Sequence, residues 1–308
     1  MLRREFITRA ARLLTLGAAG GTLAGCASME GLGTVGGQLG DVLDARQRGY
    51  LKDVLRIGGE VAKATEQLDA EQEYYLGRTV TANVLARYPV YDPKEANDYV
   101  ATVGRYVSLF SSQPETFGGY HFQIIDSDEI NALSAPGGMI TVTRGMLRCC
   151  RGEDDLAAVL AHEIGHVQSR HGVQAIRQSR INHLATVVGS EVIDRRGSER
   201  LQELVGVLDG AIEDILDTLI MNGYSRSFES EADRAAVRIL RRAGYDDHAL
   251  IAMLDEMGRR LRPGRPDFAR THPSPADRIR DIERRLGTNR PDPSPVRQRR
   301  FEQAMAAV

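Results

Sequence analysis

The chain has 308 residues, of which 42% are hydrophobic and 27% charged, a composition typical of a globular protein. The net charge of −2 and the absence of Trp argue against nucleic acid as a partner, because neither a basic field nor a stacking platform is available. With only three cysteines, at positions 26, 149 and 150, no disulfide framework is expected. Cys149 and Cys150 are adjacent, a strained geometry for a disulfide, so we expect two structural thiols near a helix start.

The first 25 residues predict an exported protein. A basic start is followed by an apolar run at 13–23, which is too short to span a bilayer and suits the core of a signal peptide. The run ends in small residues and Cys26, as in a bacterial lipobox, and this resemblance implies cleavage before Cys26 and lipidation of its thiol. Residues 3–7, Arg-Arg-Glu-Phe-Ile, also resemble a twin-arginine export signal. A cytosolic protein with a chance apolar start is the alternative.

The expected organisation is a membrane-anchored chain with one folded domain. Ala27 after the cysteine resembles lipoproteins sorted to the outer membrane, so we expect a periplasm-facing lipoprotein held by acyl chains. No later apolar run has membrane-spanning length. We assign a signal peptide to 1–25, a lipidated cysteine and flexible glycine-rich tether to 26–40, the folded domain to 41–290, and a disordered basic tail to 291–308.

The domain begins with helices and then changes pattern. Apolar periodicity predicts one or two amphipathic helices within 41–88 and another at 95–110. Residues 120–125 alternate like a strand, and 139–143 are β-branched and predict a second strand. A Pro-Gly-Gly turn signal at 136–138 lies between them. We therefore expect a hairpin-like pair of strands leading into a helix.

Helices account for most of the remaining domain. Residues 153–180 predict a strong helix with acidic residues in its first turn, where the helix dipole favours them, and with an apolar stripe. Residues 181–222 carry two amphipathic stretches, which we interpret as core, a lid over a cleft or a partner surface. Further helices are expected at 226–242, 247–260 and 275–286. The fold class is thus α+β, predominantly helical.

A metal-site pattern lies on the helix at 153–180. His162 and His166 are four apart on one face, so both rings can reach one ion, and Glu163 can approach an exchangeable ligand of that ion. A catalytic zinc site has three protein ligands and a water, whose pKa the metal lowers so that the glutamate can take its proton. The alternative is a surface helix with two solvated histidines, which would not need the apolar stripe. A purely structural zinc site would have no role for Glu163.

The third ligand decides the class of site. In metzincins a third histidine lies six residues after the second with a glycine midway, but these positions hold Gly172 and Ser169 here. His171 is one residue short and, at 100° per residue, points about 140° away from His166. We therefore interpret His171 as a structural or surface histidine.

A later helix offers another third ligand. Glu229 and Asp233 are four apart and share a face, while Glu231 faces elsewhere. Glu229 can complete a zinc site, and Asp233 can then accept a hydrogen bond from a histidine ring and fix its orientation. Taken alone, this segment is better described as an ordinary acidic helix face.

Four segments together resemble the gluzincin peptidase family that includes the CAAX prenyl endopeptidase, HtpX, Oma and BepA. They are 131–138 (Asn-Ala-Leu-Ser-Ala-Pro-Gly-Gly), 156–171 with the metal pattern and a trailing Arg-His, 229–233, and 271–273 (Thr-His-Pro) with Arg278 downstream. The joint match in this order is far more specific than any one segment.

The resemblance implies a zincin-like metallopeptidase fold with a small β-sheet beside the helix of the metal pattern. It implies one zinc ion held by His162, His166 and Glu229, with Asp233 bonded behind a ligand and Glu163 as the catalytic base. Unlike HtpX or the CAAX prenyl endopeptidase, this sequence shows no expected transmembrane helix, which favours the periplasmic lipoprotein members and argues against prenylated substrates.

Two further residues acquire roles only by resemblance. The strand after Asn131 would present its backbone to an extended substrate, so Asn131 is an expected substrate-binding residue. His272 would approach the zinc side of the cleft, where it would stabilise the oxyanion of a tetrahedral intermediate or occupy the water position in a resting state. These two roles of His272 stay open.

The expected function is a zinc-dependent endopeptidase that hydrolyses cell-envelope proteins in periplasmic quality control. Its expected partners are protein or peptide substrates, including misassembled envelope proteins, and the membrane through the lipid anchor. The alternative is an envelope chaperone or assembly-factor lipoprotein with little or no proteolysis.

Overall fold

The computed structural model describes residues 68–175, 177, 223–260, 274–286 and 294–308. The expected signal peptide, Cys26, the tether, the stretch 181–222 and His272 lie outside the described residues.

Two helices open the described part of the domain. Helix α4 (Ala70–Arg87) begins in a capping box, in which Asp69 and Gln72 each accept the other's backbone N–H. Helix α5 (Lys94–Ser108) follows, and its apolar residues at 96, 100, 103 and 107 form a buried stripe. Both helices fall within ranges where the sequence predicts them.

Three strands form one mixed sheet within the described residues, in the order β1-β3-β2. Strands β1 (His121–Ile125) and β3 (Met139–Thr143) pair in parallel, so the expected hairpin between them is wrong. The hairpin partner of β3 is instead β2 (Ala132–Ala135), joined to it by the 3₁₀ turn η1 (Pro136–Gly138). The turn signal was placed correctly, but β2 is too short and small-sided to show strand alternation. Gly137 and Gly138 in the turn have φ of 73° and 94°, values that favour glycine.

The next elements carry the metal pattern. Helix α6 (Arg144–Leu147) leads to α7 (Glu153–Gln168), which is shorter than the helix expected at 153–180. Its regular turns end at Gln168, and Arg170 adopts a left-handed φ of 53° that redirects the chain. Cys149 and Cys150, just before α7, are free and buried, and burial raises the pKa of both thiols, as expected of structural cysteines.

The later helices pack around α7. Helix α11 (Arg226–Ala243) is capped by the Ser225 side chain and ends at Gly244, whose φ is 76°. Helices α12 (Ala249–Arg260) and α14 (Pro275–Glu283) follow. The predominantly helical α+β class is confirmed.

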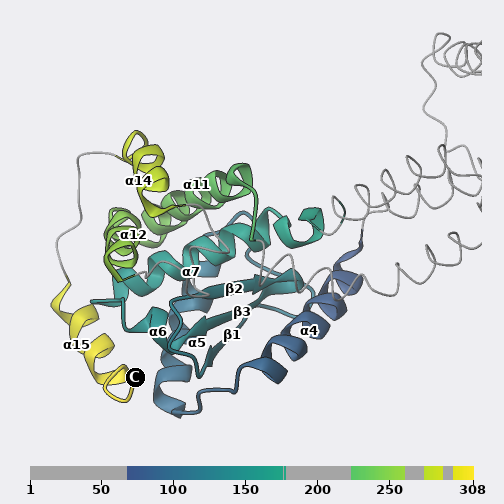
Figure 1. The fold of residues 1–308 in the computed structure, drawn as a ribbon, viewed down its shortest axis with the longest axis horizontal. Coiled ribbons are helices and arrows are strands. Elements are labelled where there is room, and N and C mark those ends of the chain that lie inside the picture. The colour runs from purple at the N-terminus through teal and green to yellow at the C-terminus, as the bar shows by residue number, and fades with distance from the viewer. Residues whose placement is uncertain (1–67, 176, 178–222, 261–273, 287–293) are drawn as a thin grey trace, which may run out of the picture. The chain divides into compact units, whose positions relative to one another are not determined.

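Helix α7 lies between the sheet and the group formed by α11, α12 and α14 (Figure 1). Helices α7 and α5 pack together on one face of the sheet, where Ile124, Ile140 and Val142 join their core. Helix α4 packs on the opposite face, where Val80 contacts Ala135 and Met139. The helix of the metal pattern is thus the centre of the core, with edge strand β2 beside it.

The C-terminal residues correct one expectation. Instead of a disordered tail, residues 295–304 form helix α15 (Pro295–Ala304), capped by Ser294, with Phe301 buried. Its Arg300 forms an ion pair with Glu153, a buried residue at the start of α7. The partners that stabilise α15 lie far back in the chain, so its local composition alone resembles that of a solvated tail.

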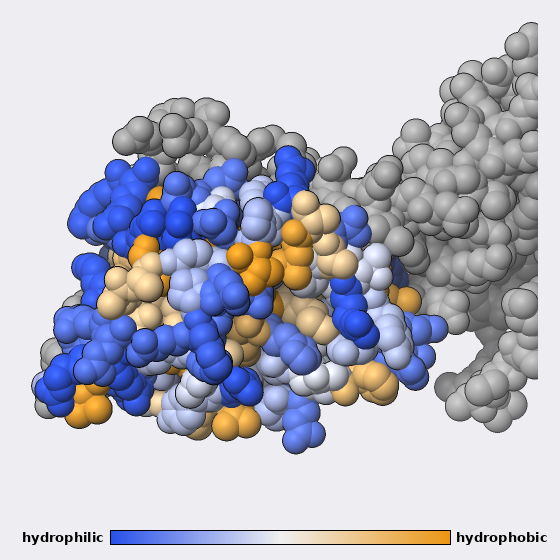
Figure 2. Space-filling view, turned by 90° about the horizontal axis from the view of Figure 1, so that it is seen from below, coloured by the Kyte–Doolittle hydropathy of each residue, from blue (hydrophilic) through white to orange (hydrophobic). Residues whose placement is uncertain are grey.

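One face of the described surface is largely hydrophilic (Figure 2). On the face drawn in Figure 2, apolar groups form separate patches among hydrophilic ones. Within the described segments, no helix combines the length and apolar character needed to cross a membrane.

Candidate metal centre

Helix α7 brings its two histidines together in the interior. His162 and His166 are 3% and 1% exposed, and their Nε2 atoms lie 3.1 Å apart. The helical spacing of four residues therefore produces the convergence that the sequence predicts.

Helix α11 adds a carboxylate to this pair. Glu229 lies in its first turn, is buried, and has oxygens 3.5 Å from His162 Nε2 and 3.3 Å from His166 Nε2. The two helices can approach this closely because residue 165 is glycine: a Cβ there would lie 2.9 Å from the Ala232 carbonyl oxygen. The glycine within the metal pattern therefore positions Glu229.

The three side chains fit a tetrahedral zinc site. Ligands at about 2.05 Å around a tetrahedral ion lie roughly 3.3 Å from one another. The observed separations are 3.1, 3.3 and 3.5 Å, and the nitrogen–nitrogen–oxygen set is one that zinc accepts. His162, His166 and Glu229 could thus hold one metal ion.

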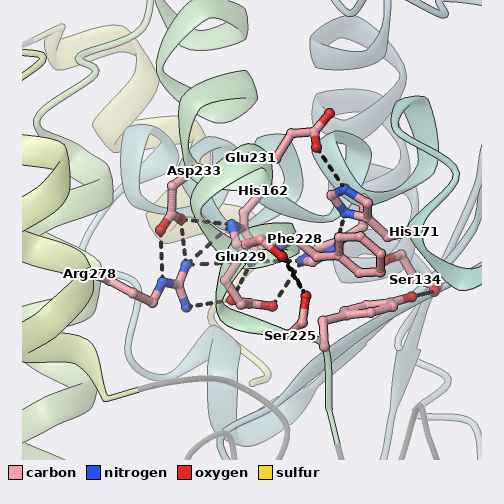
Figure 3. Close-up of polar contacts among 12 residues, drawn as sticks. Ser134, His162, His171, Ser225, Phe228, Glu229, Glu231, Asp233 and Arg278 are labelled. Atoms are coloured by element: carbon pink, nitrogen blue, oxygen red, sulfur yellow. Dashed lines mark hydrogen bonds and ion pairs between the residues drawn. The ribbon is translucent and has the colours of Figure 1, made fainter. Parts of the chain in front are cut away.

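Behind His162 lies an ion pair that the sequence only partly indicated. Asp233 Oδ1 is 2.9 Å from His162 Nδ1, the contact expected of this carboxylate. Arg278 on α14 donates to both Asp233 oxygens, at 2.6 and 3.0 Å, and its Nη1 lies 3.4 Å from Glu229 (Figure 3). Arg278 is 5% exposed, so it is a buried cation between two buried carboxylates.

These charges determine the electrostatics of the site. Burial and the Arg278 charge oppose protonation of His162, but the bonds to Asp233 and Glu229 outweigh them and raise its pKa to about 9. For His166, burial dominates and lowers the pKa to about 4. Burial opposes ionisation of Asp233, yet Arg278 and His162 hold its pKa well below the ordinary value. The two histidines therefore have very different surroundings.

His171 differs from its sequence interpretation as a residue pointing away. It is fully buried, and its Nδ1 lies 2.9 Å from His166 Nδ1. The angle of 140° presumed that α7 continues, whereas α7 stops at Gln168 and Arg170 takes a left-handed φ before the chain becomes helical again at 171–175. Residues 168–170 contain no glycine or proline to mark the helix end, so the sequence carried no signal of this contact.

The remaining predicted residues occupy different positions. Glu163 is buried on α7, next to His162. Asn131 is buried beside the start of β2, where its backbone oxygen accepts the Thr143 N–H at 3.0 Å. The structure brings His162, His166, Glu229 and Asp233 together, and His272 lies outside the described residues.

The register of β2 defines its free edge. Because Asn131 pairs directly with Thr143, the alternation of an antiparallel ladder directs the backbone groups of Ala132 and Ser134 away from β3. The Tyr224 hydroxyl lies 3.3 Å from the Ser134 carbonyl oxygen, and its ring stacks on His166 with centroids 4.2 Å apart. This tyrosine joins the sheet edge to the metal site and was missed in the sequence.

Among the described residues, a second group of Asp246, Asp247 and His248 has metal-like spacing. Asp247 is already paired with Arg241, and His248 contacts both aspartates. We assign no ion to this group.

The chain was compared with known proteins. Residues 94–286 match Peptidase family M48. The chain is 30% identical over 250 residues to the beta-barrel assembly-enhancing protease of Yersinia pestis, covering 79% of this chain and 49% of that protein. It is also 30% identical over 202 residues to the mitochondrial metalloendopeptidase OMA1 of Schizosaccharomyces pombe, covering 63% of this chain and 54% of that protein. The chain spans about half the length of these curated relatives.

Proposed function

Because this chain belongs to Peptidase family M48, a family of metallopeptidases, we propose that it is a zinc-dependent endopeptidase. The observation that carries the proposal is the buried convergence of His162, His166 and Glu229 at tetrahedral spacing. Zinc is the proposed ion, since two imidazole nitrogens and one carboxylate are a donor set of catalytic zinc sites.

The residues of the site divide the chemistry of peptide hydrolysis. A bound zinc ion supplies Lewis acidity, which polarises a carbonyl group and makes water more acidic. Glu163 accepts the proton of the attacking water and passes it to the leaving amine. Asp233 fixes the orientation of His162, and Arg278 offsets part of the negative charge of Asp233 and Glu229. His272 remains our candidate for oxyanion stabilisation or for occupying the water position.

The substrate is proposed to bind along β2. An extended peptide can add to the free edge of this strand through the backbone groups of Ala132 and Ser134, and Asn131 lies at its start. Tyr224 contacts this edge at Ser134, so the peptide has to displace the tyrosine hydroxyl there.

The substrates proposed are proteins of the cell envelope. The name beta-barrel assembly-enhancing protease, carried by relatives of this chain, suggests work on envelope proteins. The export pattern at 1–25 and Cys26 support a periplasm-facing lipoprotein at the outer membrane. The alternative, an envelope chaperone or assembly factor with little or no proteolysis, would use the same free edge of β2 to bind unfolded segments.

A digestion assay with metal analysis tests the proposal. The purified mature chain is expected to contain one zinc and to digest casein, and a chelator should abolish digestion. Glu163→Gln should retain zinc and lose digestion, whereas Glu229→Ala should lose zinc. Chelator-insensitive digestion, or full activity in zinc-loaded Glu163→Gln, would contradict the proposed mechanism. Zinc binding without digestion, together with suppression of aggregation, would favour the chaperone.

A further inference from the structure

His171 lies against a proposed ligand without being one. Its Nδ1 is 2.9 Å from His166 Nδ1, while the other nitrogen of His166, Nε2, faces His162 and Glu229. The contact is therefore on the side of the His166 ring that faces away from the proposed ion.

The geometry gives this contact a direction. A histidine that ligates through Nε2 keeps its proton on Nδ1, which then needs an acceptor. His171 Nδ1 lies 2.9 Å from His166 Nδ1, and in that contact His171 accepts the hydrogen bond through an unprotonated Nδ1. A neutral histidine ring offers one such unprotonated nitrogen.

The far side of His171 meets a carboxylate. With Nδ1 accepting, the proton of the neutral ring resides on Nε2, and this atom lies 3.5 Å from Glu231 Oε2 (Figure 3). Ser169 donates to the other Glu231 oxygen at 3.0 Å, which directs the carboxylate towards the ring. The His171 ring itself stacks on Phe228, with centroids 4.4 Å apart and planes within 8°.

We propose that His171 is a positioning residue for His166, and that Glu231 in turn orients His171. The chain of contacts runs from the Glu231 carboxylate through His171 to His166, and it fixes the tautomer and the ring plane of that ligand. It is the counterpart, for His166, of the direct Asp233 contact to His162. The inference rests on the proposed function, because it assigns His166 to a metal ion.

Substitutions at His171 separate the hydrogen bond from the packing. His171→Phe keeps a flat ring against Phe228 and removes the acceptor, whereas His171→Asn places an acceptor oxygen near the position of Nδ1. Phe228→Leu is the matched control, since it removes the stack and leaves the hydrogen bonds. Glu231→Gln tests the contact between Glu231 and His171, and the half-exposed side chain at position 231 should tolerate substitution.

The measurement is the zinc dissociation constant, obtained by competition with a chelator, alongside thermal unfolding of the metal-free protein. His171→Phe should weaken zinc binding about 10- to 100-fold, the usual effect of removing the partner of a ligating histidine. His171→Asn should recover most of this loss, Glu231→Gln should show a smaller loss than His171→Phe, and Phe228→Leu should bind zinc as the parent does.

Several outcomes overturn the inference. Unchanged zinc affinity in His171→Phe refutes it, as does equal weakening in Phe228→Leu, which would make packing the cause. If His171→Phe does not fold, unchanged affinity in Glu231→Gln refutes it. A parent protein that binds no zinc defeats the proposed function itself, whereas a zinc-binding parent with unaffected variants defeats only the role of His171.

Discussion

Arg278 is the residue whose loss should most clearly expose the charge balance of the site. Three buried carboxylates lie at or beside the histidine pair, on Glu163, Glu229 and Asp233. Arg278 contacts two of them, at 2.6 Å from Asp233 and 3.4 Å from Glu229. Arg278→Leu keeps much of the volume and leaves these two carboxylates without their cation.

The cost can be worked from the contacts. Breaking a buried ion pair by removing one partner costs about 3–5 kcal/mol. We expect about 3 kcal/mol in the metal-free protein, because Asp233 keeps its 2.9 Å contact with His162. For a domain of this size that loss corresponds to a drop of roughly 6–12 °C in Tm. The loss should be smaller in zinc-saturated protein, since the bound ion compensates Glu229, one of the two carboxylates that Arg278 contacts.

Denaturant unfolding in the presence of zinc and in the presence of a chelator measures the loss of stability in the zinc-saturated and in the metal-free protein. Arg284→Leu, at the C-cap of α14, is the control: it removes an exposed ion pair to Asp281 and should cost less than about 1 kcal/mol. A metal-free Arg278→Leu that unfolds within 1 kcal/mol of the parent would refute the reasoning. So would an equal loss with and without zinc, because the ion would then not share the charge role of Arg278.

Three further predictions follow from other contacts. Gly165→Ala should lower zinc affinity because its Cβ forces α7 and α11 apart, and calorimetric titration with zinc measures this; unchanged affinity would contradict it. Burial opposes ionisation of Glu153, but the bond to Arg300 outweighs it and holds the pKa below its ordinary value of 4.5, so Glu153 stabilises the fold above that pH and this contribution is lost as the pH falls below it. Acid unfolding of Arg300→Gln should therefore show a shallower loss of stability below pH 4.5 than the parent, and identical slopes would reject the pairing. Tyr224→Phe frees the Ser134 carbonyl and should lower KM for a peptide with little change in kcat; a fall in kcat alone would oppose the proposed edge binding.

The metal pattern could be predicted because its geometry is local. A spacing of four residues on one helix places His162 and His166 on the same face whatever surrounds them. Glu229 could be assigned only by resemblance, since its distance from the histidines depends on how closely α7 and α11 pack. The close packing of α7 and α11 requires a glycine at position 165, but the sequence does not indicate that Ala232 lies against it.

What could not be predicted depends on chain direction and on distant partners. The predicted pairing of the strands was wrong because β2 was not recognised: it has four residues with mostly small side chains and no alternation that distinguishes it from a turn. The predicted direction of His171 was wrong because α7 ends at Gln168, where no glycine or proline marks the end of a helix. Arg278 and Arg300 acquire buried partners on α11 and α7, which no local pattern reveals.

The three acidic residues of α11 each contact a different set of histidine atoms. Glu229 faces the Nε2 atoms of both histidines, Asp233 meets His162 Nδ1, and Glu231 points away from both towards the ring of His171. Residues 229 and 233 share a face, as their spacing dictates, and Glu231 lies on another face with its side chain 48% exposed. Glu231 can still act on the site because His171 extends the contact outward from α7. On our proposals, α11 therefore supplies the ligand Glu229 and also the carboxylates that orient the two histidine ligands. Asp233 orients His162 directly, and Glu231 orients His166 through His171.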